Sequence, residues 1–130
     1  MVLDTSALVA ILRDEPERSA FNRAIEAADT RLLSVASFLE TSMVIDARHG
    51  PDGVRDLDLF IAKTDIDLVT VDADQAYVAR TAFRTYGKGR HPAGLNFGDC
   101  FAYALAKTSG EPLLFKGSDF PSTDITRGSS

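Results

Sequence analysis

The sequence predicts an α/β fold in which helices cover both faces of a central, mainly parallel sheet. Short apolar runs alternate along the chain with longer segments whose apolar residues recur every three or four positions. This alternation favours parallel pairing, because each return to the sheet then passes through a helix. A chain of 130 residues is long enough for one such domain and too short for two. We therefore expect a single domain over residues 1–126 and a disordered tail over residues 127–130.

The first predicted strand is short and ends at an acid. The apolar run Val2-Leu3 stops at Asp4, and a helix is expected from Ser6 to Leu12. A second, amphipathic helix should begin near Pro16 and run to Ala28, because proline suits a first helical turn. Residues 31–35 are the second predicted strand.

The next segment predicts two helices separated by a break. Ser37 matches a helix cap with Glu40 three residues later, the capping-box pattern, and His49-Gly50-Pro51 should end that helix. A further helix is expected over residues 51–63. The predicted apolar stripe of the first of these helices, on the face that also carries Glu40, consists of Ala36, Met43, Val44 and Ala47.

The rest of the chain repeats the alternation of strand and helix. Its predicted elements, in order, are a strand at 67–71, a helix from an Asp72 cap to Tyr86, a mobile basic loop at 87–94, a helix at 97–107, a strand at 112–115 and a marginal strand at Ile125.

Composition narrows the possible functions. The formal net charge of −5 means that the molecule as a whole does not attract nucleic acid, so any RNA contact needs a local cluster of basic residues. No apolar run approaches membrane-spanning length, and we expect no membrane partner. The single Cys100 forms no intrachain disulfide, which suits a cytoplasmic location.

Two carboxylates in the first part of the chain have both a structural and a functional explanation. Asp4 follows the first strand, where open α/β sheets form their ligand crevice, but an Asp just before a helix is equally well explained as its cap. Glu40 lies on an apolar helix face, where an ionised side chain is costly unless it is paired or bound to a cation. The capping box with Ser37 is the competing explanation.

Two further carboxylates follow glycine-containing turns. Asp99 is explained as a helix cap, yet a helix N-terminus also keeps a carboxylate ionised, as a metal ligand must be. Asp119 lies beyond the fourth strand, in the place that Asp4 occupies after the first. If the fold brings these two acids together with Asp4 and Glu40, the oxygen-only ligands favour Mg²⁺, or Mn²⁺ in its place, over Zn²⁺.

Four segments share their order and spacing with a known family. They are Val2-Leu3-Asp4-Thr5-Ser6-Ala7-Leu8, Ser37-Phe38-Leu39-Glu40, Leu95-Asn96-Phe97-Gly98-Asp99-Cys100, and Leu113-Leu114-Phe115-Lys116-Gly117-Ser118-Asp119-Phe120. In these segments, which span nearly the whole chain, the sequence resembles the PIN-domain ribonucleases, specifically the VapC toxins of type II VapBC toxin–antitoxin systems.

The resemblance implies a fold, a site and a set of partners. The fold is a PIN-like three-layer α/β/α sandwich. Its acidic pocket holds Mg²⁺ through Asp4, Glu40, Asp99 and Asp119, with Asp4 and Asp99 as the most direct ligands. The implied activity is that of an endoribonuclease toxin that cleaves tRNA or rRNA and blocks translation. The implied partners are the RNA substrate, a VapB-type antitoxin and a second copy of the chain, in a larger toxin–antitoxin complex. Glu40 is open to three roles: general base, metal ligand, or a residue that orients water.

A basic cluster precedes Asp99 and provides candidates for RNA contact. Arg84, Lys88 and Arg90 extend from the end of one helix into the loop that leads to Asp99. A solvated polar face is the competing explanation. The phenylalanines are dispersed along the sequence and are expected in the core or in protein contacts.

Three other functions compete with the ribonuclease hypothesis. A haloacid-dehalogenase-like phosphatase also begins with an Asp after its first strand, but it needs a second Asp where this chain has Ser6. A metal-dependent DNA nuclease would use the same acidic pocket. A non-catalytic interaction module would keep the fold without the chemistry, and the four carboxylates argue against it.

Overall fold

Four parallel strands form one sheet in the order β3-β2-β1-β4 in the computed structural model, which describes residues 1–128. Val2 of the central strand lies opposite Leu32 on one side and Leu113 on the other. The predicted parallel sheet is therefore confirmed. The strands are β1 (Val2–Leu3), β2 (Leu32–Ser34), β3 (Asp67–Val69) and β4 (Leu113–Leu114).

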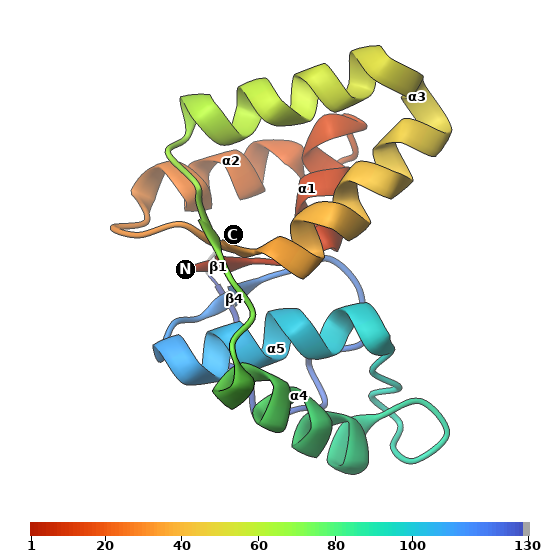
Figure 1. Ribbon diagram of the computed structural model, residues 1–130. Coiled ribbons are helices and arrows are strands. Elements are labelled where there is room, and N and C mark those ends of the chain that lie inside the picture. The colour runs from red at the N-terminus through yellow and green to blue at the C-terminus, as the bar shows by residue number, and fades with distance from the viewer. Residues whose placement is uncertain (129–130) are drawn as a thin grey trace.

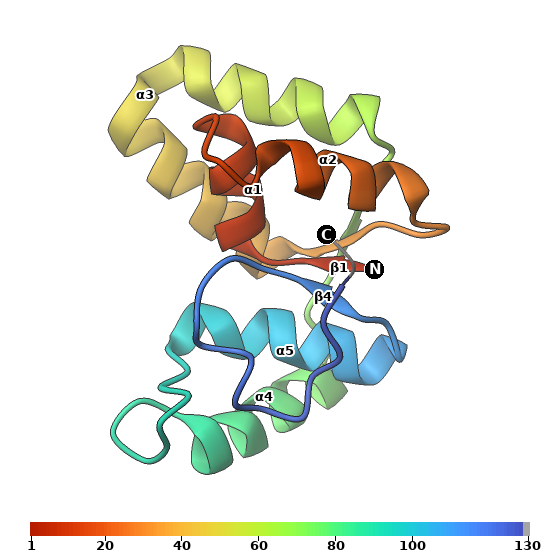
Figure 2. The same ribbon diagram turned by 180° about the vertical axis from the view of Figure 1, so that it is seen from behind.

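Within residues 1–128, five helices cover the two faces of this sheet. The helices α1, α2 and α3 form one layer, and α4 with α5 forms the layer on the opposite face (Figures 1 and 2). The three-layer arrangement expected from the sequence is confirmed. The helices are α1 (Thr5–Leu12), α2 (Arg18–Ala27), α3 (Val35–Lys63), α4 (Ala73–Tyr86) and α5 (Phe97–Ser109). No helix formed by residues 1–128 is both long and apolar enough to cross a membrane.

The two-residue strands β1 and β4 supply one side chain to each layer. Successive residues of a strand point to opposite faces of the sheet. Val2 and Leu113 accordingly join the core beneath α4 and α5. Leu3 and Leu114 join the core beneath α1 and α2. All four are fully or almost fully buried, as expected for a parallel sheet covered on both faces.

Helix α3 begins earlier than expected and buries a different face. Ser34, not Ser37, is its N-cap, and the Ser34 hydroxyl accepts a hydrogen bond from the Ala36 N–H. The predicted capping box is therefore wrong, because the helix follows strand β2 without a loop. The predicted apolar stripe is also wrong, since Met43 is 64% exposed. The buried face carries Thr41, whose hydroxyl donates to a backbone carbonyl of the preceding turn and so can enter the core.

The predicted helix break at residues 49–51 is confirmed. Gly50 has a φ of 64° and divides α3 into two limbs, residues 35–49 and 51–63, which fold back over α1 and α2 (Figure 1). Gly53 allows the second limb to start close to the first, because a Cβ there would lie 2.6 Å from the His49 Cβ.

The C-terminal segment is attached to the sheet further than expected. The Leu113 N–H donates to the Thr126 carbonyl, and the Gly128 N–H donates to the Leu113 carbonyl. Arg127, rather than the predicted Ile125, pairs with Leu113 as an isolated bridge. The expected disordered tail at 127–130 is thus wrong for residues 127 and 128, because strand β4 offers them its free edge. Residues 129–130 lie outside the described part of the chain.

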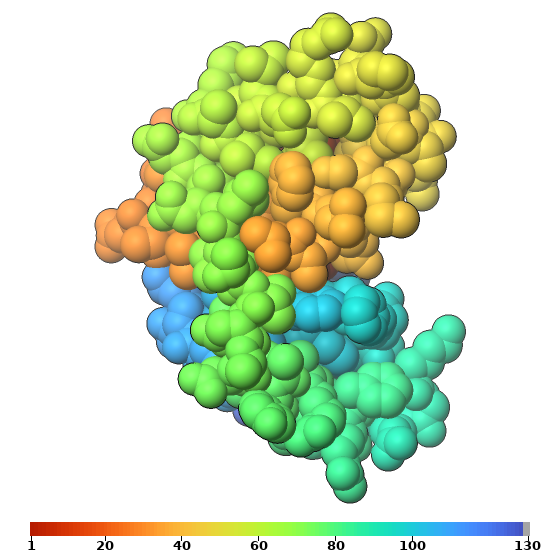
Figure 3. All heavy atoms as spheres, in the orientation of Figure 1, coloured from red at the N-terminus to blue at the C-terminus, as the bar shows by residue number. Residues whose placement is uncertain are grey.

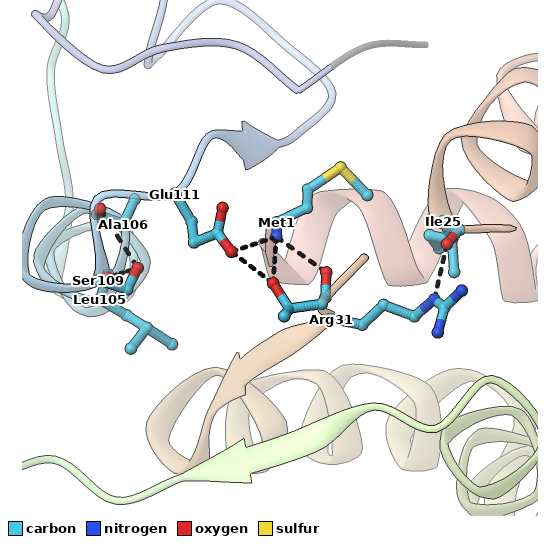
Figure 4. Close-up of polar contacts among 8 residues, drawn as sticks. Met1, Ile25, Arg31, Leu105, Ala106, Ser109 and Glu111 are labelled. Carbon is cyan, nitrogen blue, oxygen red and sulfur yellow. Dashed lines mark hydrogen bonds and ion pairs between the residues drawn. The ribbon is translucent and has the colours of Figure 1, made fainter. Parts of the chain in front are cut away.

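A polar cluster lies at the amino ends of β1, β2 and β4 (Figure 4). The Met1 amine donates to the Thr30 carbonyl at 2.9 Å and lies 3.4 Å from a Glu111 carboxylate oxygen. The Thr30 hydroxyl also donates to Glu111. At this end of the sheet, the charge of the Glu111 carboxylate is therefore neutralised by the chain's own residues.

Candidate acidic site

The carboxyl ends of β1 and β4 face the same side of the molecule as the start of α5. Figure 3 shows the outline indented there, between the first limb of α3 and the loop that follows α4. The acids predicted from the sequence come from the four elements around this indentation. Asp4 follows β1, Glu40 lies in α3, Asp99 lies in α5 and Asp119 follows β4.

Asp4 is both a helix cap and a buried acid. Its Oδ2 accepts hydrogen bonds from the Ser6 N–H at 3.0 Å and from the Ser6 hydroxyl at 2.6 Å. Asp4 is therefore the N-cap of α1, and Thr5 and Ser6 do not take that place. Because both bonds go to Oδ2, capping and metal binding through Oδ1 do not exclude each other.

Glu40 is held from two sides. Its Oε1 accepts a hydrogen bond from the Thr5 hydroxyl at 2.7 Å, and the Thr41 hydroxyl oxygen lies 3.1 Å from the Thr5 oxygen. The other side of its carboxylate packs on the start of α5 at Gly98. A Cβ on Gly98 would lie 2.2 Å from Glu40 Oε2 and 2.7 Å from Oε1. Only glycine at this position leaves the carboxylate where it lies, directed toward the acidic site and away from Ser37.

Asp99 is buried at the start of α5 but is not its cap. Asn96 is the N-cap, and its side chain accepts the Asp99 N–H at 2.9 Å. Asp99 returns a bond, since its Oδ2 accepts the Asn96 N–H at 3.1 Å. This reciprocal capping box fixes the Asp99 carboxyl by one oxygen. The prediction of Asp99 as the N-cap is therefore wrong, because the N-cap lies three residues earlier. Asparagine is common at helix N-caps, so Asn96 could have been recognised in the sequence.

The electrostatics of the site penalise its ionised carboxylates. Burial above all raises the pKa of Asp4 to about 6, with a contribution from the charge of Glu40 and against the hydrogen bonds from Ser6. Burial is also the largest cause that raises the pKa of Asp99 to about 8, against a hydrogen bond from Asn96. The charge of Asp4 and the carboxyl of Asp119 contribute to that rise. These effects link all four acids into one electrostatic group.

Asp119 lies at the rim of this group. It is only half-buried, in the turn after β4. The start of that turn is tied to the site, because the Lys116 N–H donates to the Ser6 hydroxyl at 2.9 Å. Ser6 thus connects the Asp4 carboxylate to the segment that carries Asp119.

The donor set fits a hard divalent cation. In the conformation of residues 1–128, no three Asp, Glu, His or Cys side chains converge as a formed metal site. Yet no Lys, Arg, His or terminal amine within these residues forms an ion pair with any of the four acids. Buried carboxylates that raise one another's pKa are stabilised when a cation binds them. Their oxygen atoms are the ligands that Mg²⁺ and Mn²⁺ prefer.

The predicted RNA-contacting residues lie on the neighbouring surface. Arg84 is exposed in the last turn of α4, which ends at Tyr86, so Lys88 does not continue its helical face. Lys88 and Arg90 lie exposed in the following loop, which is closed by the Lys88 N–H bonded to the Leu95 carbonyl at 2.9 Å. His91 is half-buried against Tyr86, with the ring centroids 5.1 Å apart.

Sequence reasoning missed the residues that hold the acids in place. Thr5, Ser6 and Gly98 contact Glu40 or Asp4 directly. A hydroxyl pair immediately after Asp4 and a glycine immediately before Asp99 were visible in the sequence. Their role required the approach of α3 to α5, which no local pattern encodes.

Comparison with known proteins identifies the family. The PIN domain family matches residues 1–125. Ribonuclease VapC30 of Mycobacterium tuberculosis is 63% identical over 125 residues, which are 96% of this chain and 95% of that protein. Ribonuclease VapC of Mycolicibacterium smegmatis is 58% identical over 125 residues, which are 96% of this chain and 97% of that protein.

Solved structures show the same fold at low sequence identity. Mycobacterium tuberculosis VapC20, described as a sarcin-ricin loop cleaving toxin, superposes with a TM-score of 0.80 at 16% identity, covering 99% of this chain and 98% of that one. VapBC2 from Rickettsia felis, bound to a DNA fragment from its promoter, gives a TM-score of 0.75 at 14% identity, covering 97% of this chain and 94% of that one.

The fold, the acidic site and these matches define the class of protein: the chain belongs to the PIN domain family. Within that family it groups with the VapC ribonucleases of VapBC toxin–antitoxin systems.

Proposed function

We propose that this chain is a Mg²⁺-dependent endoribonuclease toxin that cleaves tRNA or rRNA in the cytoplasm, blocks translation and is neutralised by a VapB-type antitoxin. The observation that carries the proposal is the pair of buried acids Asp4 and Asp99. Burial penalises the ionisation of both, the charge of Asp4 adds to the penalty on Asp99, and neither has a cationic partner among residues 1–128. A protein retains such an arrangement when the charge serves function.

Asp4 and Asp99 are the proposed principal Mg²⁺ ligands, with Glu40 and Asp119 completing the acidic group. Bound Mg²⁺ would supply Lewis-acid stabilisation of the phosphodiester and a water of lowered pKa. Ser6 holds one carboxylate oxygen of Asp4, and the Asn96 N–H holds one carboxylate oxygen of Asp99. The two carboxylates therefore need little reorganisation when the substrate binds.

Glu40 is the residue proposed to position or deprotonate the attacking water. The Thr5 hydroxyl and Gly98 restrict its carboxylate to one orientation. A restricted carboxylate at the edge of a phosphodiester site serves as a base or as an orienting acceptor, and the two roles share the same geometry.

The relatives' names support a protein partner as well as RNA. One structural neighbour, covering 95% of this chain with a TM-score of 0.69, is a toxin–antitoxin complex from Klebsiella pneumoniae. On this chain, Leu39 and Met43 are 59% and 64% exposed, one helical turn apart on the limb of α3 that carries Glu40. We propose that the antitoxin covers this apolar surface, and that the toxin forms a homodimer within the larger complex.

The test compares the unsubstituted protein with Asp99→Asn. Asparagine keeps the oxygen that accepts the Asn96 N–H, so the helix start is preserved while the charge is lost. Cellular RNA is incubated with each protein, with Mg²⁺ or with EDTA, and new RNA ends are mapped. We expect Asp99→Asn to lower the cleavage rate by at least about 100-fold, because even residues supporting a metal ligand are worth 10- to 100-fold.

Undiminished cleavage by Asp99→Asn would overturn the site assignment. A protein that binds neither Mg²⁺ nor Mn²⁺ and is harmless when expressed without an antitoxin would instead favour a non-catalytic interaction module.

A further inference from the structure

The turn that carries Asp119 is attached at its two ends and not between them. At its start, the Lys116 N–H donates to the Ser6 hydroxyl at 2.9 Å, and after its end the Phe120 side chain is buried. Residues 117–119 form no backbone–backbone hydrogen bond within residues 1–128. The position of Asp119 therefore depends on how firmly the two ends are held.

The start of the turn has a second attachment, through the Lys116 side chain. Its ammonium donates to Glu15 Oε1 at 2.8 Å and lies 3.3 Å from Glu17 Oε2. Both acids belong to the turn between α1 and α2. The ion pairs therefore join two turns that lie 101 residues apart in the sequence. We call Lys116, Glu15 and Glu17 the ion-pair clamp.

The turn between α1 and α2 is itself well anchored. The Glu15 N–H donates to the Ala10 carbonyl at 2.9 Å, and the Glu15 carbonyl accepts the Arg18 N–H at 2.9 Å. Glu15 Oε2 also lies 3.4 Å from an Arg13 guanidinium nitrogen. The clamp therefore fastens the less constrained turn, at residues 116–119, to the more constrained one.

The clamp keeps its own charges. The hydrogen bond from Lys116 lowers the pKa of Glu15, and the hydrogen bond from Glu15 raises the pKa of Lys116, so both stay charged at neutral pH. The Glu17 side chain forms no cap hydrogen bond with α2, and Lys116 is its only ion-pair partner within residues 1–128. Because two acids share the Lys116 ammonium, it is less suited to contact a phosphate than the unpaired cations of the loop after α4.

Stability is a weak reason for these ion pairs. The side chains of Lys116, Glu15 and Glu17 are 37%, 25% and 35% exposed, and partly exposed pairs contribute little to the free energy of unfolding. Their place in the fold offers a better reason. The N–H of the clamped lysine is bonded to Ser6, whose hydroxyl donates to Asp4 Oδ2 at 2.6 Å. The clamp thus acts on a segment that leads from one acid of the site to another.

We propose that the ion-pair clamp is a positioning device for Asp119, which holds that carboxylate where it completes the divalent-cation site. The inference rests on the proposed metal-dependent function and deepens it, because it assigns Lys116, Glu15 and Glu17 a role at the acidic site. These residues act through Asp119 and contact neither the cation nor RNA.

The experiment measures Mn²⁺ binding in the absence of RNA, by isothermal titration calorimetry. The unsubstituted protein is compared with Lys116→Met, which keeps the aliphatic stem and removes the ammonium, and with Lys116→Arg, which keeps the charge. The matched control is Lys107→Met, because the Lys107 ammonium lies 2.9 Å from Asp124 in another partly exposed ion pair. Each variant is also made in an Asp119→Asn background, and thermal unfolding checks that every protein is folded.

Lys116→Met should weaken Mn²⁺ binding by about 3- to 10-fold, the range that the loss of two partly exposed ion pairs allows. A variant with both Glu15→Gln and Glu17→Gln should show the same loss. Lys116→Arg should retain most of the affinity, and Lys107→Met should leave it unchanged. In the Asp119→Asn background, which itself binds Mn²⁺ more weakly, Lys116→Met should cause no further loss, because the carboxylate that it positions is gone. High salt should reduce the difference between Lys116→Met and the unsubstituted protein, since salt screens exposed charges.

Equal Mn²⁺ affinity for Lys116→Met and the unsubstituted protein would overturn the clamp and leave the proposed metal-dependent function intact. A further loss in the Asp119→Asn background would also overturn it, because the ion pairs would then act on the site as a whole. Undiminished binding by Asp119→Asn would remove Asp119 from the site and the clamp with it. Failure of the unsubstituted protein to bind Mn²⁺ would overturn both proposals.

Discussion

Carboxylates lie in opposite electrostatic environments at the two ends of the strands. At the amino ends, the Thr30 hydroxyl and the Met1 amine lower the pKa of Glu111 (Figure 4). At the carboxyl ends, burial and neighbouring acids raise the pKa values of Asp4 and Asp99 to about 6 and about 8. The acid at the amino end is neutralised by the chain's own residues, whereas no cationic group of residues 1–128 pairs with the four acids at the carboxyl end. We propose that the carboxyl end is the one that functions, because perturbed pKa values cluster at functional sites.

The largest effect on stability is expected for Asp99→Asn in EDTA. We expect the free energy of unfolding at pH 8 to rise by about 1–3 kcal/mol, because a penalised charge is removed while the capping bond to Asn96 remains. Urea unfolding provides the measurement. Asp72→Asn, at the exposed cap of α4, is the matched control and should change little. A destabilised Asp99→Asn would contradict the electrostatic account.

The pH dependence of the unsubstituted protein has a defined sign. A carboxyl whose pKa is raised above its ordinary value of 3.8 stabilises the fold fully below that pH. That stabilisation is lost as the pH rises through about 6 for Asp4 and about 8 for Asp99. In EDTA, stability from these groups should fall between about pH 4 and pH 8, most steeply below about pH 6 where both groups contribute, and Mg²⁺ should flatten the slope. An equal slope with and without Mg²⁺ would show that the cation does not bind these acids.

Gly98→Ala tests whether Glu40 needs its present orientation. The new Cβ would overlap the Glu40 carboxylate, so the side chain must move. We expect cleavage to fall by about 10- to 100-fold, since helix α5 itself tolerates alanine. In a Glu40→Ala background the same substitution should cost nothing further, because the overlap is gone. An additional loss in that background would assign Gly98 a role apart from Glu40.

Thr5→Val removes the hydroxyl that donates to Glu40 and keeps the shape of the side chain. Cleavage should decrease by about 10-fold, whereas Thr5→Ser, which retains the hydroxyl, should stay close to the unsubstituted protein. The cleavage rate is measured at saturating RNA. Similar rates for the valine and serine variants would remove Thr5 from the site.

The smallest effect is expected for Glu111, at the amino ends of the strands. Glu111→Gln loses the ion pair with the Met1 amine, which is partly exposed to solvent, and should lower the thermal midpoint slightly at pH 7 without changing RNA cleavage. A rise in the midpoint, matching the stabilisation expected for Asp99→Asn, would show that the carboxylates at the two ends of the strands do not differ in their electrostatic cost.

The sequence alone was sufficient for features that depend on short-range patterns. The alternation of apolar runs and amphipathic segments predicted the parallel sheet with helices on both faces, and His49-Gly50-Pro51 predicted the division of α3. The four candidate acids were also visible, since each lies next to a predicted strand end or helix start. Local patterns suffice here because strand and helix periodicity and backbone breaks are properties of neighbouring residues.

Only the tertiary structure decided how those acids are held. The capping box at Ser37 was plausible locally, but strand β2 feeds directly into α3, and Glu40 turns to Thr5 and Gly98 instead. The burial that raises the pKa values of Asp4 and Asp99 comes from the approach of β1, α3 and α5. The ion pair of Lys116 with Glu15 likewise exists only where the turn after β4 approaches the turn between α1 and α2. Desolvation and the contact of distant segments depend on the whole fold, so no stretch of sequence carries them by itself.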